Sequence, residues 1–194
     1  FQEMFFPLRI QDDDRHGGSR RRRSLVVFTS GRSGLENVDS LVRSWGLQHY
    51  DYVICHFDDS QAEWSKLDWY KHAVGFRANR QAKMWFFKRA LSPWLVQGYE
   101  YVHFIDSDAG SPPEQPFHLA EYEAKLIEAG VVLGQPAVTV KEKSSEHLAC
   151  RQQAGSRLRW TNFVENGPFF SVHVPDHAFS KLWEMVNPAA VSGY

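Results

Sequence analysis

Two aspartates separated by a single residue are the clearest chemical signal in this sequence. The stretch YVHFIDSDAG, residues 101–110, places Asp106 and Asp108 directly behind an apolar run. Two close carboxylates repel each other, so one is expected to keep its proton unless a cation lies between them. Carboxylate oxygens suit Mg²⁺ or Mn²⁺, which keep open positions for water or phosphate oxygens. The spacing predicts a divalent-cation site, although an acidic turn after a strand has the same pattern.

The segments around this motif alternate between strand and helix patterns. Apolar, β-branched runs predict strands, and apolar residues three to four apart predict helices. We expect strands at 24–29, 52–57, 101–105 and 131–133, and helices at 35–45, 79–91 and 119–129. Such alternation predicts a single α/β domain over 24–194 with a mostly parallel sheet covered by helices, preceded by an arm and polar linker at 1–23.

Polar residues follow the carboxyl ends of the first two predicted strands. Asp58 and Asp59 come after the second strand, and Ser30-Gly31-Arg32-Ser33-Gly34 forms a glycine loop after the first. Ligands of open α/β sheets bind beyond the carboxyl ends of the strands. We therefore expect Asp58, Asp59, Asp106 and Asp108 to converge on one edge of the sheet.

Basic residues open the second predicted helix. Arg80 and Lys83, together with the positive end of that helix, could bind an anionic diphosphate. Lys88 and Arg89 are expected to form an ordinary solvated face. Alternatively, Arg80 and Lys83 belong to the same solvated helix face and bind no diphosphate.

Two further residues are candidates for the chemistry. Glu165 lies between aromatic stretches before a Gly-Pro turn, where a raised pKa would let it act on a hydroxyl as a base. It could equally accept hydrogen bonds from the following turn. His173 could approach the metal, although most histidines near such a position are surface residues.

Composition excludes several classes of protein. The net charge of −1 gives no reason to expect a nucleic-acid partner. Cys55 and Cys150 make neither a disulfide framework nor a zinc pattern. No apolar run approaches the length of a membrane helix, so any anchor is expected to lie outside this chain, which begins at Phe1 and resembles a piece of a longer protein.

Several ordered blocks resemble one protein family. The segment 62–110, with NRQAKMWFF and YVHFIDSDAG, and the later EAGVVLGQPAVT and WTNFVENGPFFS resemble a plant family labelled "lysine-ketoglutarate reductase trans-splicing related". The resemblance spans roughly 53–194. It departs from the family pattern at Ser107, where the family has an acid, and at Ala109, where it has a leucine.

That family is thought to resemble nucleotide-sugar glycosyltransferases of the GT-A fold, a Rossmann-like α/β fold. The resemblance implies that Asp106 and Asp108 bind the metal and donor diphosphate, and that Asn79 and Lys83 belong to the donor-binding helix block. Glu165 would match the late acidic residue. The family runs on past the position of Tyr194 into a Gly-x-Asp, so the domain is expected to be incomplete at its C-terminal end.

The resulting hypothesis is a metal-dependent glycosyltransferase. It would pass a sugar from a nucleoside-diphosphate donor to a hydroxyl on a glycan, polysaccharide or glycoprotein, with Asp58 or Asp59 contacting the nucleoside. By family analogy we expect a lumenal Golgi location. A non-catalytic scaffold that binds nucleotide sugar or carbohydrate is the alternative from a different class, since fold alone does not establish activity. An Asp-x-Asp phosphotransferase or phosphatase is disfavoured, because those enzymes usually carry the motif on their first strand.

Overall fold

A computed structural model describes residues 23–109, 116–137 and 169–186 of the 194-residue chain. Its strands are β1 (Ser24–Ser30), β2 (Tyr50–His56), β3 (Val74–Arg77), β4 (Tyr101–Asp106), β5 (Leu133–Gly134) and β6 (Phe169–His173). Its α-helices are α1 (Leu35–Trp45), α2 (Gln61–Trp64), α3 (Lys83–Ala90), α4 (Pro93–Val96), α5 (Leu119–Glu128) and α6 (Ala178–Met185). Three single 3₁₀ turns complete the described elements: η1 (Arg32–Gly34), η2 (Tyr70–His72) and η4 (Pro175–His177).

The six strands form one sheet in the order β3-β2-β1-β4-β6-β5. Strands β1 to β4 are mutually parallel, whereas β6 runs antiparallel to both β4 and β5. The chain proceeds from β1 outward to β2 and β3, then returns to place β4 on the other side of β1. The point between β1 and β4 is therefore the topological switch point, where open α/β sheets bind their ligands.

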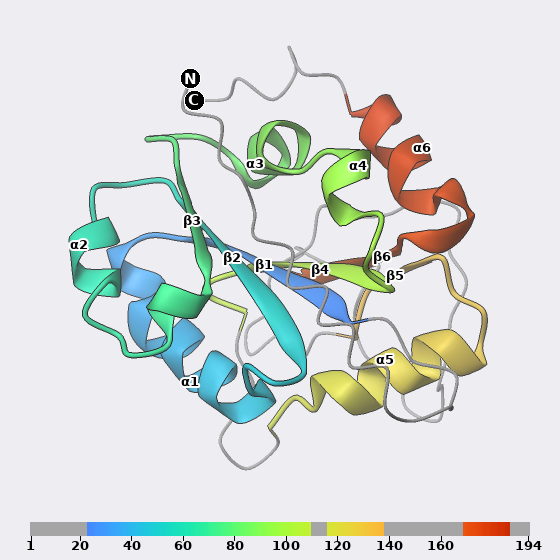
Figure 1. Ribbon diagram of the computed structural model, residues 1–194, viewed down its shortest axis with the longest axis horizontal. Helices are drawn as coiled ribbons and strands as arrows, with labels where there is room; N and C mark the ends of the chain where they lie inside the picture. Colours follow the sequence, from blue (N-terminus) through green and yellow to red (C-terminus); the bar gives the residue numbers. More distant parts are fainter. Residues whose placement is uncertain (1–22, 110–115, 138–168, 187–194) are drawn as a thin grey trace, which may run out of the picture.

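Helices cover both faces of this sheet (Figure 1). One face packs against α3, α4 and α6, with Phe86, Phe87 and Phe179 fully buried against Val27 and Phe104. The other face packs against α1 and α5, and its apolar residues from the strands and α1 include Val26, Phe28, Ile54, Val38 and Val42. Neighbouring strand residues such as Val26 and Val27 enter opposite cores because successive side chains of a strand point to opposite faces.

Most of the predicted elements are confirmed. The strands predicted at 24–29, 52–57 and 101–105 and the helices at 35–45 and 119–129 match β1, β2, β4, α1 and α5 within two residues at each end. The mixed α/β class with a mostly parallel, helix-covered sheet is confirmed as well. Cys55 is a buried core residue, as expected, and its thiol is free. Cys150 lies outside the described residues.

The helix predicted at 79–91 is wrong in its first turn. Helix α3 begins only at Lys83, because Arg80 has a left-handed backbone with φ 57° and Ala82 is extended. Strands β3 and β6 were not predicted from the sequence. Both are short, and β6 follows an aromatic stretch without the alternation that marks a half-buried strand.

Among the described residues, no helix has the length and apolar character needed to span a bilayer. Most of the predicted arm and linker at 1–23 lies outside the described residues, so that division stays a prediction.

Gly34 lets the loop after β1 pack directly against the turn after β4. A Cβ added at Gly34 would lie 2.2 Å from Ser107 Cβ and 2.5 Å from Ser30 Oγ. Those distances are too short for any side chain, so the approach depends on glycine at this position. This contact closes the switch point into a narrow junction between the two loops.

We predict that Gly34→Ala lowers the free energy of unfolding by about 1–3 kcal/mol, because overpacking forces neighbouring backbone to move. Gly98→Ala is the matched control, since a Cβ there would meet no atom within 4 Å. Urea unfolding of both variants measures the difference. Adding Ser107→Gly to Gly34→Ala should recover part of the loss, and equal stability of the two single variants would contradict the packing argument.

Candidate functional site

The first strand and the acidic turn meet through a direct side-chain contact. Thr29, near the end of β1, donates its hydroxyl to Asp106 Oδ1 at 2.8 Å. The backbone N–H of Ser107 also donates to the Thr29 carbonyl at 3.1 Å. The parallel ladder pairs Thr29 with Asp106, so these contacts continue the sheet beyond its last core residues. Asp106 is thereby fixed at the switch point.

The turn that follows is held from α1. Asn37 donates its side-chain amide to the carbonyl of Ser107 at 2.7 Å and to that of Ala109 at 3.2 Å. The Ala109 N–H closes the turn on the Asp106 carbonyl at 2.9 Å. Asp108, at the outer position of the turn, is exposed. The turn thus presents one half-buried and one exposed carboxylate on a fixed backbone.

Lys83 forms an ion pair with the inner carboxylate. Its Nζ lies 2.7 Å from Asp106 Oδ2 and 5.8 Å from the centre of the Phe170 ring. The Lys83 side chain is only 7% exposed, whereas that of Asp106 is 32% exposed. Lys83 is the first residue of α3, so its side chain reaches the switch point from a helix anchored in the core by Phe86 and Phe87.

Asp58 has a positioning role at the end of β2. Its carboxylate accepts the Arg32 N–H at 2.8 Å and the Ser60 N–H at 3.0 Å. Burial alone would raise its pKa, but the hydrogen bonds from Ser60 and Arg32 outweigh that effect and hold the pKa of Asp58 below its ordinary value. Asp58 therefore stays ionised and ties the glycine loop after β1 to the end of β2. A Cβ at Gly31 would lie 2.4 Å from Asp58 Oδ2, so this contact also requires glycine.

Asp59 belongs to a separate exposed group at the ends of β2 and β3. It pairs with Arg77 and accepts the Asn79 side-chain N–H at 2.9 Å. The neighbouring Arg80 is exposed, and its backbone N–H donates to the Phe57 carbonyl at 2.8 Å. Adjacent strands lie about 4.8 Å apart, so the end of β2 lies about 10 Å from that of β4. The predicted residues therefore form a row along one edge rather than a single cluster.

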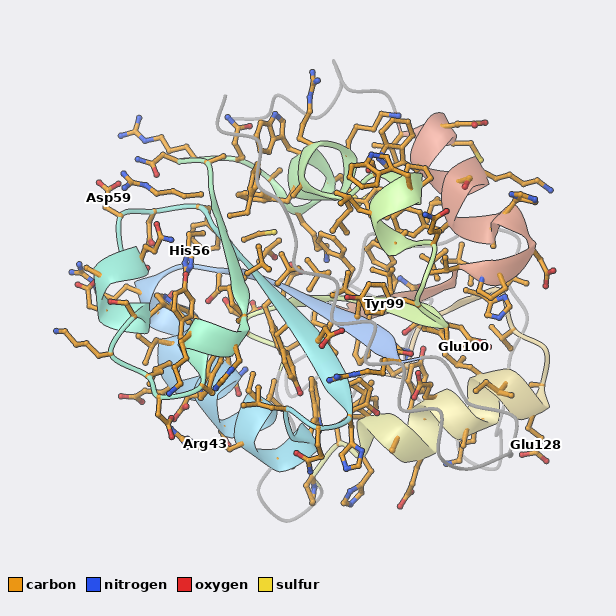
Figure 2. All side chains as sticks on the ribbon, in the orientation of Figure 1. Arg43, His56, Asp59, Tyr99, Glu100 and Glu128 are labelled. Carbon is orange, nitrogen blue, oxygen red and sulfur yellow. The ribbon has the colours of Figure 1, made fainter. Side chains whose placement is uncertain are left out.

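His173 does not reach this row. It pairs with Tyr101 at the start of β4, five residues and about 16 Å along the strand from Asp106. Its Nε2 lies 3.3 Å from Glu100 Oε1. Figure 2 shows Glu100 well away from His56 and Asp59. His173 therefore cannot share a metal ion with Asp106 and Asp108, and that part of the sequence prediction is wrong for a geometric reason. Glu165 lies outside the described residues.

The residues present fit a cation that takes much of its coordination from a ligand. Within the three described ranges, no group of three or more His, Cys, Asp or Glu side chains could hold a metal ion by itself. Asp106 and Asp108 offer two carboxylates at the turn, and Mg²⁺ commonly uses one or two carboxylates plus substrate phosphates and water. The donor set fits such a cation, with Lys83 already in contact with one of the carboxylates.

His56 is a buried histidine that the sequence analysis did not single out. It is the last residue of β2, with 0% exposure, and its Nε2 lies 2.7 Å from the Tyr70 hydroxyl. Its Nδ1 has no hydrogen-bond partner among the described residues. Burial lowers the pKa of His56 to about 4, and the nearby charge of Asp58 opposes that shift only in part. The imidazole is therefore neutral at physiological pH.

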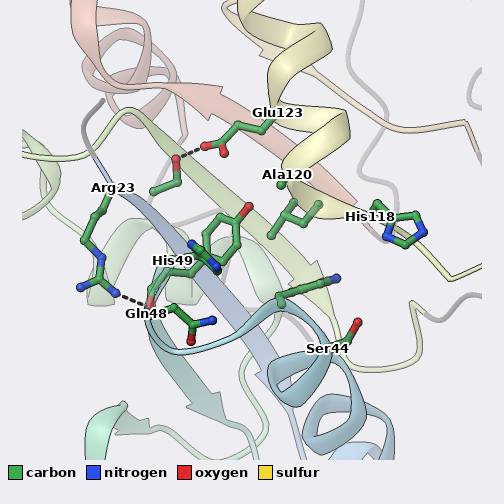
Figure 3. Close-up of a pocket in the computed structure, with 11 residues that line it drawn as sticks. Arg23, Ser44, Gln48, His49, His118, Ala120 and Glu123 are labelled. Carbon is green, nitrogen blue, oxygen red and sulfur yellow. Dashed lines mark hydrogen bonds between the residues drawn. The ribbon is translucent and has the colours of Figure 1, made fainter. Parts of the chain in front are cut away.

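A pocket of about 470 Å³ opens at the amino ends of the strands, opposite the acidic turn (Figure 3). Its lining includes Ser24 at the start of β1, Tyr50 at the start of β2, and Glu123 of α5. Glu123 is buried and accepts a hydrogen bond from the Ser24 hydroxyl. None of the predicted site residues lines this pocket. Its position at the amino ends of the strands separates it from the acidic turn.

The chain thus forms an α/β domain that carries an acidic turn and a glycine loop at the switch point of its sheet. Comparison with family models gives one match, "Protein of unknown function (DUF707)", over residues 5–169. The chain belongs to this family. The family description assigns no activity, and the plant-family label stays a prediction. No curated protein matches the chain.

Two crystal structures of the glycosyltransferase GlyE from Streptococcus pneumoniae TIGR4 show a distant likeness. The apo form is 15% identical with a TM-score of 0.38, over 84% of this chain and 36% of that one. The second structure is 14% identical with a TM-score of 0.37, over 89% and 42%. This chain thus spans about two fifths of their length. At these TM-scores the likeness is too weak to carry an argument.

We predict that His56 makes the fold sensitive to acid. The unfolded chain takes up a proton near pH 6.5 that the folded protein takes up only near pH 4, so stability falls as the pH drops through this window. The loss contributed by His56 should reach about 3 kcal/mol, at about 1.4 kcal/mol per pKa unit. Urea unfolding of the wild type and of His56→Gln between about pH 7 and about pH 4.5 measures it. A wild-type decline no steeper than that of His56→Gln would refute the assignment.

Proposed function

We propose that this chain is a metal-dependent glycosyltransferase domain of the GT-A type. It would transfer a sugar from a nucleoside-diphosphate donor to a hydroxyl of a glycan, polysaccharide or glycoprotein acceptor. The observation that carries the proposal is the acidic turn Asp106-Ser107-Asp108 at the switch point, placed between a glycine loop and a buried lysine. The turn follows β4, an interior strand of the mostly parallel sheet, and such a sheet agrees with the Rossmann-like fold that the family resemblance implies.

The proposed roles follow from the positions of the side chains. Asp106 and Asp108 would hold a Mn²⁺ or Mg²⁺ ion, which supplies charge neutralisation for the departing diphosphate. Lys83 would meet the phosphate oxygens as a further cation from the buried side. The loop Gly31–Gly34 lies beside the turn, and its lack of side chains at Gly31 and Gly34 allows the backbone to come close to both neighbouring loops.

The nucleoside would lie toward β2 and β3. Asp59, Asn79 and Arg77 form an exposed polar group there, and exposed polar side chains can accept and donate hydrogen bonds to a base or ribose. Asp58 would act indirectly, because its carboxylate already holds the glycine loop and Ser60. Arg80 is available at the same end, with its side chain exposed.

Two roles remain predictions drawn from the sequence alone. Glu165 would act as the base or as an acceptor contact, and the domain would work in the Golgi lumen. Glu165 lies outside the described ranges, and the location depends on the family resemblance.

The test is a thermal-shift titration of the chain with Mn²⁺ and with UDP, GDP, ADP and CDP, separately and together. A ligand that binds only the folded state at a hundredfold excess over its Kd stabilises by about 2.7 kcal/mol. For a domain of this size that corresponds to a rise in Tm of about 5–10 °C. We expect one nucleotide to give such a rise only when Mn²⁺ is present.

The double variant Asp106→Asn with Asp108→Asn should lose the Mn²⁺-dependent rise in Tm. Asp176→Asn is the matched control, since Asp176 is an exposed aspartate at the other end of the sheet and asparagine tolerates its left-handed backbone. A double variant that retains the full shift would refute the assignment of the metal. Binding of a nucleotide sugar without hydrolysis or transfer, across a panel of acceptors, would instead favour the scaffold alternative.

A further inference from the structure

Both oxygens of the Asp106 carboxylate already have hydrogen-bond donors. Oδ1 accepts the Thr29 hydroxyl at 2.8 Å, and Oδ2 accepts the Lys83 ammonium at 2.7 Å. The two donors differ in charge. A neutral hydroxyl on one oxygen leaves a carboxylate free to bind a cation elsewhere, whereas an ammonium at hydrogen-bond distance neutralises it.

An ammonium and a divalent cation cannot both lie close to this carboxylate without strong repulsion. Two cations on one carboxylate are separated by only about 4 Å, and their repulsion is weakly screened where water is excluded. The Lys83 side chain is 7% exposed and packs over the Phe170 ring, so little solvent separates it from Asp106. Two arginines at the same ends of the strands have other partners, since Arg32 pairs with Glu63 and Arg77 pairs with Asp59.

We propose that Lys83 is a built-in competitor of the metal ion at Asp106. In the ligand-free protein its ammonium occupies the carboxylate and keeps the affinity for a divalent cation low. A nucleoside diphosphate gives the ammonium another anion to bind, which frees Asp106 for the metal. Metal and donor therefore bind together, and the metal alone binds poorly. This inference rests on the proposed function of the site.

The geometry allows Lys83 to make this exchange. Its backbone belongs to α3, which Phe86 and Phe87 anchor in the core. The side chain has four methylene groups, so the ammonium can shift from Asp106 to a neighbouring phosphate while the helix stays in place. Thr29 would retain its hydrogen bond to Asp106 in both states.

The experiment measures the binding of Mn²⁺ alone, from the electron paramagnetic resonance signal of the free ion, in the wild type and in Lys83→Met. Methionine has similar length, lacks the charge and packs favourably against the Phe170 ring. We expect Lys83→Met to bind Mn²⁺ about tenfold more tightly, since removal of a charge-assisted hydrogen bond unmasks the carboxylate. At saturating Mn²⁺, the same variant should bind UDP, or whichever nucleotide the wild type prefers, about tenfold more weakly.

These opposite changes in affinity distinguish competition from a structural role of Lys83, because damage to the fold would weaken the binding of both Mn²⁺ and the nucleotide. Lys125→Met, which removes the same charge from an exposed position on α5, should change neither affinity. Thr29→Val should not tighten Mn²⁺ binding, since the donor it removes is neutral. If Lys83→Met does not fold, Lys83→Gln removes the charge and retains a donor, and the same two changes are expected.

Unchanged or weaker Mn²⁺ binding by a folded Lys83 variant would overturn the competition. A wild type that binds neither Mn²⁺ nor any of the four nucleoside diphosphates would instead refute the proposed function, and this inference with it. The two failures are distinct, because the first is measured in a protein that does bind metal with nucleotide.

Discussion

The close approach of Gly34 to Ser107 is the constraint on which the rest of this site depends. The loop after β1 and the turn after β4 come from neighbouring parallel strands, so their backbones must pass within the width of one side chain. Glycine on one side and serine on the other allow that passage. The Ser107 backbone can then bond to Thr29 and to Asn37, and these contacts fix the direction of both aspartates. A side chain at Gly34 would displace the turn and the carboxylates with it.

Charge along this edge is balanced pair by pair. Lys83 neutralises Asp106, Arg77 neutralises Asp59, and backbone N–H groups satisfy Asp58. His56 contributes no charge, because burial keeps its imidazole neutral. Asp108 differs from these groups in being exposed at the outer end of the turn. A ligand that binds at Asp106 or Asp59 would therefore have to exchange partners with a residue that already forms a pair, which makes binding there a rearrangement of existing contacts.

The sequence predicted the layout of the sheet better than the contacts made at its edge. The apolar run 101–105 and the helical spacing from Leu35 to Trp45 predicted β4 and α1, because burial on one or both faces determines those patterns. Asp106, Asp58 and Lys83 were identified because charged residues at strand and helix ends are visible in a sequence. Whether Lys83 would pair with Asp106 or with a ligand depends on where α3 begins. The left-handed backbone at Arg80, which delays that helix, has no signal in the residue types.

Thr29 and Asn37 were missed because their importance comes from distances between segments about 70 residues or more apart. His173 was misplaced because the reversed direction of β6 was not predicted.

That reversal of β6 also has a consequence for the packing around the acidic turn. An antiparallel strand beside β4 begins where β4 ends, so Phe169 lies opposite Ile105 at the edge that carries the acidic turn. The core strands β1 to β4 are complete before the chain reaches this point. The first residue of β6 therefore takes part in the packing near the acidic turn although it is distant from that turn in the sequence, since Phe169 is buried and its ring centre lies 5.3 Å from that of Phe117. A sequence change at Phe169 would thus reach the acidic turn through the apolar core, without altering any polar residue beside it.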